Sequence, residues 1–434
     1  MKTQNTDEGL KRVVGVPALT MSFVNGSIGA GMFALPAIVS IQLGAFGIIC
    51  YLFCGMMLAT IMLCYAEIGS RITSSGGSYA YVEAAFGPFA GYIINWLFFF
   101  GWGLLSDAAV LNILTDSLSV LFPVFVNPLF RAILFFVLLS FLTVINILGV
   151  KDGAKFVQII TVVKLLPLFG IIFFGFSHIN MANLHLEHLP TLQTFGNTAL
   201  ILFFAFAGFE ASLNVSGELK DPKHTVPISL LLGGVISLII ILSIQIVVQG
   251  VLGTEIVHFK DAPVAAVAEK VLGSVGKIIV IFASVLCCWG IIIGDVLTIP
   301  RLLFAGAKDG LFPNYLAKVH PKYATPYWAI ITYAEVMFIL SVSAGFQQLA
   351  ILASASILLI YLSVILATIK LRAKTAINDE KTFKIPGGLA IPILGIVSII
   401  WLLFSLSRQE MYSTVLFIAV VAGIYFGMKR LQKK

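Results

Sequence analysis

The sequence predicts an all-α integral membrane protein, on the evidence of its composition and of the length of its apolar segments. Of the 434 residues, 59% are hydrophobic and only 11% are charged, whereas soluble globular chains carry about 25% charged residues. Segments of the roughly 20 apolar residues needed to cross a bilayer recur along nearly the whole chain. We therefore expect residues 1–434 to form a single transmembrane domain without a separate soluble domain.

Twelve apolar segments are predicted to be transmembrane helices. Two sets of five helices would cover about 15–176 and about 194–370, followed by two extra helices over about 389–428. Because five is an odd number, the second set would cross the membrane in the opposite direction to the first, which gives a five-plus-five inverted repeat. The predicted segments are 15–40, 44–68, 88–121, 129–149, 155–176, 194–214, 226–251, 276–306, 327–344, 347–370, 389–407 and 411–428.

The basic residues between these segments predict the orientation. If both termini are cytoplasmic, the inside loops hold about 21 of the 27 Lys and Arg and the outside loops about five, as the positive-inside rule requires. The net charge of +7 is then a feature of topology. We expect the lipid bilayer of the cell (inner) membrane as the surroundings, and no nucleic-acid partner.

Three glycines interrupt the first segment. Gly26, Gly29 and Gly31 lie near its middle, and broken backbone is tolerated at that depth only where it is buried in protein or lines a cavity. The N–H groups freed at the start of a half-helix attract anions. The pattern predicts a binding site for a small charged solute, as in secondary transporters. A glycine cluster that lets helices pack closely is the second interpretation.

The sixth segment has a similar weak point. Residues Ala207 and Gly208 precede Glu210, a carboxylate at membrane depth. An ionisable residue inside a membrane segment is a functional hypothesis by default. Matching interruptions in the two sets of helices indicate a site near the membrane midplane, so we expect helices 1 and 6 to be broken and to form a transporter's site.

Four stretches of the chain resemble the amino acid–polyamine–organocation (APC) superfamily, in the order and spacing of that family. They are Ile28–Phe33; Tyr65-Ala66-Glu67 with Ser74–Val82; Phe204–Glu210 with Lys220-Asp221-Pro222 and Val226-Pro227; and Arg301–Ala305 with Asp309–Pro313. The resemblance implies a twelve-helix transporter that works by alternating access. Its substrates would be amino acids, their decarboxylated amines or related organic cations, held between helices 1, 3, 6, 8 and 10.

An amino acid substrate would be held mainly by backbone groups. The N–H groups of Gly29, Ala30 and Gly31 suit its carboxylate by charge and geometry. Many relatives have Ser or Thr at the position of Ala30, so a side-chain contact there is in doubt. The carbonyl groups expected to bind the ammonium are those near Ser27 and Ile28 and those of Phe204, Ala205 and Ala207.

The resemblance also implies roles for three side chains around this site. Phe204 resembles an aromatic gate that covers the substrate from outside, and its alternative is a Phe that faces lipid or core. Ser106 and Trp289 match pocket positions of the arginine-exchanger branch. Buried packing is the alternative for Trp289.

Lys164 lies near the middle of the fifth segment, too deep to reach the membrane surface easily. In similar family members a lysine here occupies the place of a sodium ion, and its ammonium would bridge the broken part of helix 1 to helix 8. It could exchange a proton during transport, or it could be a permanently charged strut.

Other intramembrane carboxylates have several possible roles. Glu210 could carry a proton, contact a cationic substrate, or bond the backbone freed by the break. We expect Asp107 and Asp295 to pair structurally with neighbouring helices, and Glu67 to pair with a cation such as Arg71.

The motifs favour a secondary active transporter over other classes. No HExxH, GxSxG or Cys/His cluster indicates an enzyme, and we expect no cofactor and no metal. A weak metal or pH-sensing site at His178, His185 and His188 is the less favoured interpretation of those loop histidines. Broken helices and lone charges fit an occluded site better than a channel. We expect amino acid movement by proton-coupled symport or by exchange; an amino acid/amine antiporter and a transporter-like sensor without net flux stay as alternatives.

Overall fold

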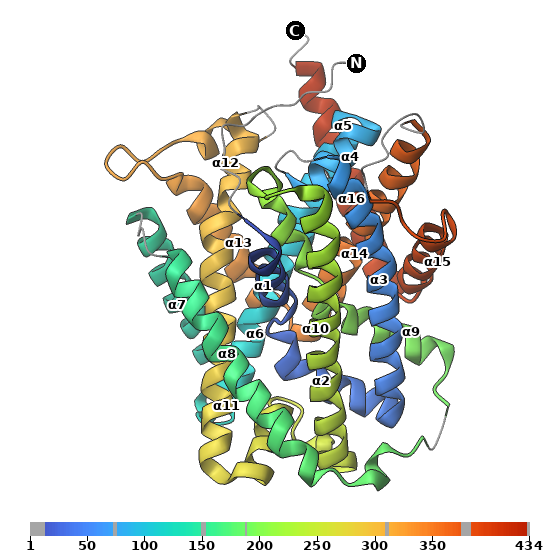
Figure 1. The fold of residues 1–434 in the computed structure, drawn as a ribbon. Helices are drawn as coiled ribbons and strands as arrows, with labels where there is room; N and C mark the ends of the chain where they lie inside the picture. The colour runs from blue at the N-terminus through green and yellow to red at the C-terminus, as the bar shows by residue number, and fades with distance from the viewer. Residues whose placement is uncertain are drawn as a thin grey trace.

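The computed structural model describes residues 14–72, 76–148, 153–186, 189–308, 312–374 and 383–431. These residues fold into a bundle of helices (Figure 1). Their one β-type pairing is an isolated bridge between Val14 and Leu219. Within the described part of the chain the predicted all-α class is therefore confirmed.

The longer helices account for most of the described chain. Their bounds are α1 Val16–Ser27, α2 Gly31–Leu43, α3 Gly47–Arg71, α4 Gly77–Phe86, α5 Pro88–Trp96, α6 Leu105–Ser119, α7 Pro128–Leu148, α8 Gly153–Gly175, α9 Leu192–Leu202, α10 Pro222–Leu252, α11 Pro263–Thr298, α12 Pro300–Lys308, α13 Tyr327–Ser343, α14 Phe346–Lys374, α15 Ala390–Phe404 and α16 Arg408–Leu431. Three shorter helical segments matter for the site: η2 Leu97–Leu104, η6 Phe203–Ala205 and η7 Phe209–Glu218.

Eight helical stretches in the described residues are long and apolar enough to cross a membrane, and three more apolar helices are shorter. The chain is therefore a multi-pass integral membrane protein. The count of twelve spans and the inverted repeat stay predictions. The eight stretches are Gly31–Arg71, Pro88–Ser119, Pro128–Leu148, Leu192–Leu213, Pro222–His258, Pro263–Lys308, Phe346–Ala373 and Arg408–Met428.

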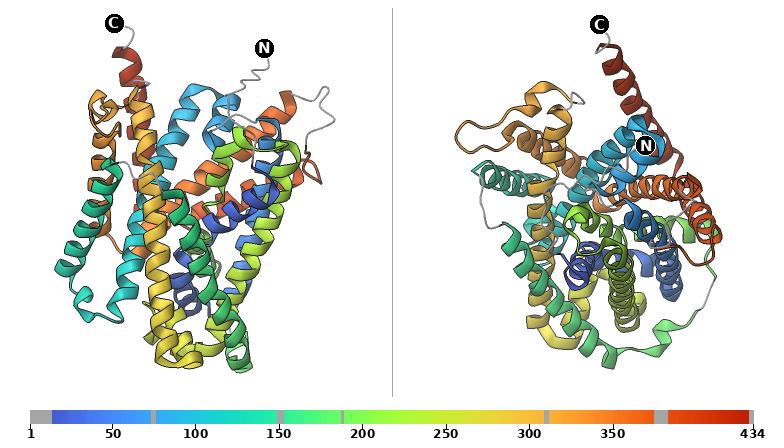
Figure 2. Two further views of the ribbon diagram at one scale, coloured as in Figure 1. Left: turned by 60° about the vertical axis from the view of Figure 1, so that its left-hand side comes forward. Right: turned by 45° about the horizontal axis from the view of Figure 1, so that its top comes forward.

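The spans differ in how deeply they are buried inside the protein. The most apolar window of Pro88–Ser119 is 78% buried, whereas the windows of Pro128–Leu148 and Arg408–Met428 are only 17% and 6% buried. The last two are nevertheless apolar, because their exposed side chains face lipid tails. The protein thus has an inner group of helices around α6 and α9, and outer helices such as α7 and α16 (Figures 1 and 2).

Both expected interruptions are present. Helix α1 ends at Ser27 and α2 begins at Gly31, so the backbone is not helical at residues 28–30. In the sixth segment, α9 ends at Leu202 and gives way to η6, an irregular stretch, and then η7. The reason is local in the second case, since Gly208 has a φ of 108°, which L-residues with side chains rarely adopt.

Helices α4, α5 and the C-terminal end of α16 lie at one end of the molecule, which is the top in Figure 1. At this end Glu67 of α3 is fully buried and forms ion pairs with Arg71, at 2.7 Å, and with Arg372 of α14. It also accepts a hydrogen bond from the N–H of Ile385, at 3.0 Å. The predicted pairing with Arg71 is confirmed, and one carboxylate joins α3, α14 and the segment that precedes α15.

Candidate substrate site

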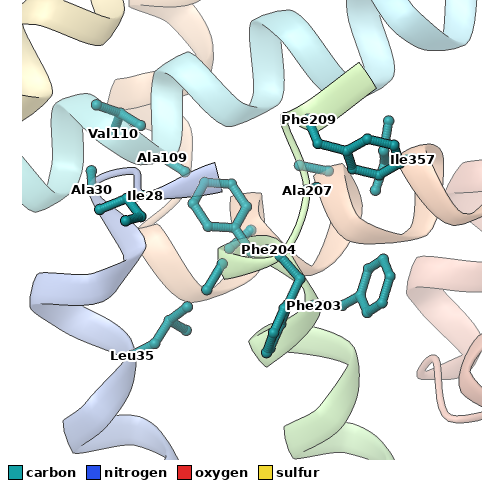
Figure 3. Close-up of a cluster of buried hydrophobic side chains, with 14 of the residues drawn as sticks. Ile28, Ala30, Leu35, Ala109, Val110, Phe203, Phe204, Ala207, Phe209 and Ile357 are labelled. Atoms are coloured by element: carbon teal, nitrogen blue, oxygen red, sulfur yellow. The ribbon is translucent and has the colours of Figure 1, made fainter. Parts of the chain in front are cut away.

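A cavity of about 310 Å³ lies where the two interrupted segments meet. Its walls come from α1, α2, η2, α6, α8, the sixth segment and α11. Nine of the predicted site residues line it: Ser27, Gly29, Ala30, Gly31, Ser106, Lys164, Phe204, Ala205 and Ala207. Figure 3 shows Ile28 and Ala30 of the first break and Phe204 of the second, with Ala109 and Val110 of α6 beside them.

Residues of the first break line this cavity. The N–H groups of Met32 and Phe33 bond back to the carbonyl groups of Gly29 (3.4 Å) and Ala30 (3.0 Å). A helix start leaves its first N–H groups without intrahelical acceptors, which applies here to the N–H groups at the start of α2. The hydroxyl of Ser27 is buried and has no hydrogen-bond partner among the described residues.

Glycine is required where the two breaks cross. A Cβ on Gly26 would lie 2.7 Å from the carbonyl oxygen of Gly208, and a Cβ on Gly208 would lie 2.7 Å from that of Gly26. By contrast, a Cβ on Gly29 would meet only the Cδ1 atom of Ile291, at 3.8 Å. Gly26 and Gly208 therefore allow the backbones to touch, whereas Gly29 leaves space open to the cavity.

Lys164 of α8 holds the end of α1. Its ammonium donates hydrogen bonds to the carbonyl oxygens of Asn25 (3.0 Å) and Ile28 (2.7 Å). The side chain is buried, with 3% of its surface exposed. A cation at a helix C-terminus is favourable because the helix dipole and the unpaired carbonyl groups are negative there. The side chain of Ile28 is fully buried, so its contribution is this carbonyl.

Glu210 has the opposite charge and binds backbone at the second break. Its Oε2 atom accepts hydrogen bonds from the N–H of Gly208 (3.1 Å) and from the hydroxyl of Tyr361 (2.6 Å). It is not among the residues that line the cavity. Of the three roles considered for Glu210, the described contacts match the one in which it bonds backbone freed by the break.

Aromatic side chains separate the cavity from a second one. The Phe204 ring packs against Trp102 of η2 and Phe346 of α14, each with ring centroids 5.7 Å apart. Phe346 also lines a cavity of about 360 Å³ together with Asn112 and Arg131. On the other side, the first cavity reaches Leu302 of α12. Phe204 therefore belongs to a layer between two cavities, each extending toward a different end of the bundle.

A π-helical segment between α5 and α6 forms part of the cavity wall. The segment η2 is π-helical and lies between α5 and α6. Such segments are rare and occur frequently at functional sites. Trp102 and Gly103 of η2 both line the cavity. The extra residue in the turn of a π-helix redirects the side chains that follow, including Ser106 one turn later.

Asp107 pairs with a neighbouring helix, as expected, whereas Asp295 also lines the cavity. Asp295 of α11 lines the cavity and is partly exposed to it. Asp107 of α6 is fully buried and accepts a hydrogen bond from the hydroxyl of Tyr333 of α13. The two carboxyl groups lie within hydrogen-bonding reach of each other. Tyr333 was missed in the sequence, where it is one aromatic residue among many in an apolar segment.

Trp289 is placed outside the cavity wall. It is absent from the lining residues, and its ring stacks on Phe141 of α7 with centroids 6.3 Å apart and planes 19° apart.

Among the described residues, no group of three or more His, Cys, Asp or Glu could hold a metal ion. Of the predicted motif residues, Ser74, Ser75, His188 and 309–311 lie outside the described residues.

Comparison with known proteins identifies the family of this chain. A family model described as amino acid permease matches residues 14–427. The serine/threonine exchanger SteT of Bacillus subtilis (strain 168) is 29% identical over 437 residues, which cover 98% of each chain. From the same organism, the branched-chain amino acid permease BcaP is 25% identical, over 99% of this chain and 95% of its own. A methylthioribose transporter, also from that organism, is 25% identical over 99% and 96%. Because the family model spans nearly the whole sequence, the chain belongs to the amino acid permease family, within the APC superfamily.

Proposed function

We propose that this protein is a secondary active transporter that moves amino acids across the membrane by alternating access. The observation that carries the proposal is the cavity at the crossing of two broken helices, which is lined by Ser27, Gly29, Ala30 and Gly31 of the first break and by Phe204, Ala205 and Ala207 of the second. Permeases and exchangers of amino acids among its relatives support the same substrate class. The cavity is large enough for a small solute and not for a polymer.

The substrate's two charged groups would bind different breaks. Its carboxylate fits the N–H groups of Gly29, Ala30 and Gly31, where the start of α2 is positive. Its ammonium fits carbonyl groups of the sixth segment, such as those of Phe204 and Ala205. Both anchors use the backbone, so the side-chain part of the cavity would decide which amino acid is preferred.

Phe204 would act as the outer gate, since it lies in the layer between the two cavities. If the termini are cytoplasmic, this conformation would face inward, because the cavity reaches Leu302 of α12. The twelve spans, the inverted repeat and the inner-membrane location belong to this proposal.

Lys164 would couple the position of α1 to the state of the transporter. Its ammonium bonds two carbonyl groups at the end of α1, so release of these bonds would free that half-helix to move. Proton exchange by Lys164 is the further role that the sequence suggests, and a pH profile of a Lys164 variant tests it.

Reconstitution of the purified protein in proteoliposomes tests the function. We expect uptake of some members of a panel of labelled amino acids, with internal amino acid, a pH gradient, or both. Flux of amines against amino acids would favour the antiporter alternative. Binding without any flux would favour a sensor and contradict the proposal, and uptake of none of the panel in vesicles that contain folded protein would contradict it too.

A further inference from the structure

The Asp107–Asp295 pair is a cluster of buried charge that the substrate-binding groups do not use. The two carboxyl groups lie on α6 and α11, both of which line the cavity. The hydroxyl of Tyr333 donates a hydrogen bond to Asp107 Oδ2. The other oxygen of Asp107, Oδ1, is buried and receives no hydrogen bond from the described residues. Asp107 thus has one oxygen that accepts a hydrogen bond and one buried oxygen that is open to a further donor.

A proton on Asp295 would supply this donor. Two carboxylates at hydrogen-bonding distance in a low-dielectric interior repel each other, and a shared proton replaces that repulsion by a hydrogen bond. Asp295 is the member that water can reach, because it lines the cavity. Asp107 is the shielded member, because no part of it is exposed.

We propose that Asp107 and Asp295 form a proton-binding site that couples amino acid transport to the proton gradient. The inference rests on the proposed function and adds to it the co-transported ion and its site. The site binds one proton between its two carboxyl groups when the cavity is open to water. It then gives the proton up on the other side of the membrane after the transporter changes state.

The pair is placed to transmit its protonation to the substrate cavity. With the proton bound, a hydrogen bond joins α6 to α11; without it, repulsion between two carboxylates pushes the same helices apart. Ser106 precedes Asp107 on α6 and Gly294 precedes Asp295 on α11, and both line the cavity. A change in the spacing of these helices therefore changes the width of the substrate cavity.

Other titratable or charged groups face the pair from the neighbouring elements. Tyr333 of α13 bonds Asp107 and Glu210 of η7 interacts with Asp295, while Lys164 of α8 and Cys287 of α11 line the same cavity as Asp295. Lys164 is engaged by the carbonyl groups of Asn25 and Ile28, and Glu210 by Gly208 and Tyr361. Neither supplies a proton to the open oxygen of Asp107, which leaves the pair to bind one from water.

The test compares Asp107→Asn and Asp295→Asn with wild type in proteoliposomes. Asparagine resembles a protonated carboxyl in size and cannot release a proton. Two assays are run on each protein: exchange of labelled for unlabelled amino acid at equal pH on both sides, and uptake driven by a pH gradient with a pH-sensitive dye inside the vesicles. A gradient of one pH unit supports about tenfold accumulation in one-to-one symport.

We expect wild type to accumulate substrate and to acidify the vesicle interior as it does so. Asp107→Asn, whose side chain lies behind the cavity wall, should keep exchange within about threefold of wild type, and both variants should lose accumulation and proton entry together. Asp116→Asn is the matched control: Asp116 lies on the same helix, pairs with Arg131 at 2.7 Å and is partly exposed. This control should still accumulate substrate. Tyr333→Phe removes the hydroxyl donor without a change of charge, and should shift the midpoint of the pH profile while exchange continues.

The outcomes separate the inference from the function. Accumulation and proton entry at wild-type levels in both variants would overturn the inference, and so would a wild type that exchanges but never responds to a pH gradient. A variant that keeps proton entry but changes its preference between cationic and neutral amino acids would make the pair a side-chain subsite, which also overturns it. If an Asp variant loses exchange, the test passes to Tyr333→Phe. An unchanged pH profile of Tyr333→Phe would then count against the site. A wild type without any uptake or exchange would instead contradict the proposed function.

Discussion

Backbone groups freed at the two broken segments are bonded by side chains of opposite charge. At the first break, the carbonyl groups at the end of α1 bond the ammonium of Lys164. At the second, the N–H of Gly208 bonds the carboxylate of Glu210. The sign follows the freed group in each case, since a helix end exposes carbonyl groups and a helix start exposes N–H groups. A charged residue in a membrane segment can therefore stabilise backbone without touching a substrate.

The crossing of the two breaks should be the most sensitive position. We expect Gly208→Ala to yield little folded protein, because its Cβ would lie 2.7 Å from the carbonyl oxygen of Gly26 and its φ is 108°. Strain and overpacking of this kind cost about 1–3 kcal/mol each. Thermal unfolding in detergent measures the effect. Gly170→Ala is the control, since a Cβ there meets nothing within 4 Å, and an equal thermal midpoint for both variants would contradict the close crossing.

The next largest loss of stability and transport should come from removing the charge of Lys164, and it should exceed the loss from removing the charge of Glu210. Lys164→Ala leaves two buried carbonyl groups without a donor, at about 1–3 kcal/mol each, so we expect lower stability and slower transport. Glu210→Gln keeps an oxygen acceptor for Gly208 and should cost less than Lys164→Ala. Uptake from about pH 5 to 8 in each variant, normalised to protein in the membrane, gives the pH profile.

The same profile separates the two roles of Lys164. A strut lowers activity without a change in the shape of the profile, which is our expectation if the proton is held by Asp107 and Asp295. A flattened profile in Lys164→Ala would assign the proton to the lysine. Lys277→Ala is the control, because Lys277 pairs with Glu269 at 2.9 Å away from both breaks.

Gly29 separates substrate binding from backbone packing, because it belongs to the first break but not to the close crossing of Gly26 and Gly208. We expect Gly29→Leu to weaken substrate binding by about a hundredfold or more, since its side chain fills the space beside the N–H groups. Stability should change little, because its Cβ meets only Ile291 at 3.8 Å. Isothermal titration with the transported amino acid measures binding, and wild-type affinity in a folded Gly29→Leu would place the substrate elsewhere.

The smallest of the four effects should come from the second break's aromatic ring. Phe204 makes two ring contacts, each worth about 0.5–1.5 kcal/mol, so Phe204→Ala should slow turnover by about tenfold. Equilibrium binding should weaken less, because a lid mainly controls conformational steps. Lost binding with normal turnover at saturation would make Phe204 a pocket wall instead of a gate.

Local sequence signals predicted the breaks and the cavity wall well. The glycines at 26–31 and 208 act on their own backbone, so they can be recognised without knowledge of the fold. Pairings across the bundle could not be predicted in that way. Tyr361 is 151 residues from Glu210, and Tyr333 is 226 residues from Asp107. In both cases the partner is an aromatic residue in an apolar segment, where its hydroxyl gives no signal.

The sequence also could not predict which side chains of α11 point toward the cavity. Trp289 and Asp295 lie on the same helix, and the sequence suggested either the pocket or buried packing for Trp289 and structural pairing for Asp295. The structure puts Asp295 on the cavity wall and stacks Trp289 on Phe141. Helical spacing relates residues of α11 to each other but does not say which face of α11 meets the cavity.

The buried carboxylate of Glu67 has a consequence for how the chain is made. Arg372 follows Glu67 by 305 residues, so a ribosome releases α3 into the membrane long before its second cation exists. Until then Arg71 is the counter-ion that the emerging chain itself provides. Nascent chains that stop before α14 would hold Glu67 by the ion pair with Arg71 alone, so the end of α3 would not yet be tied to α14.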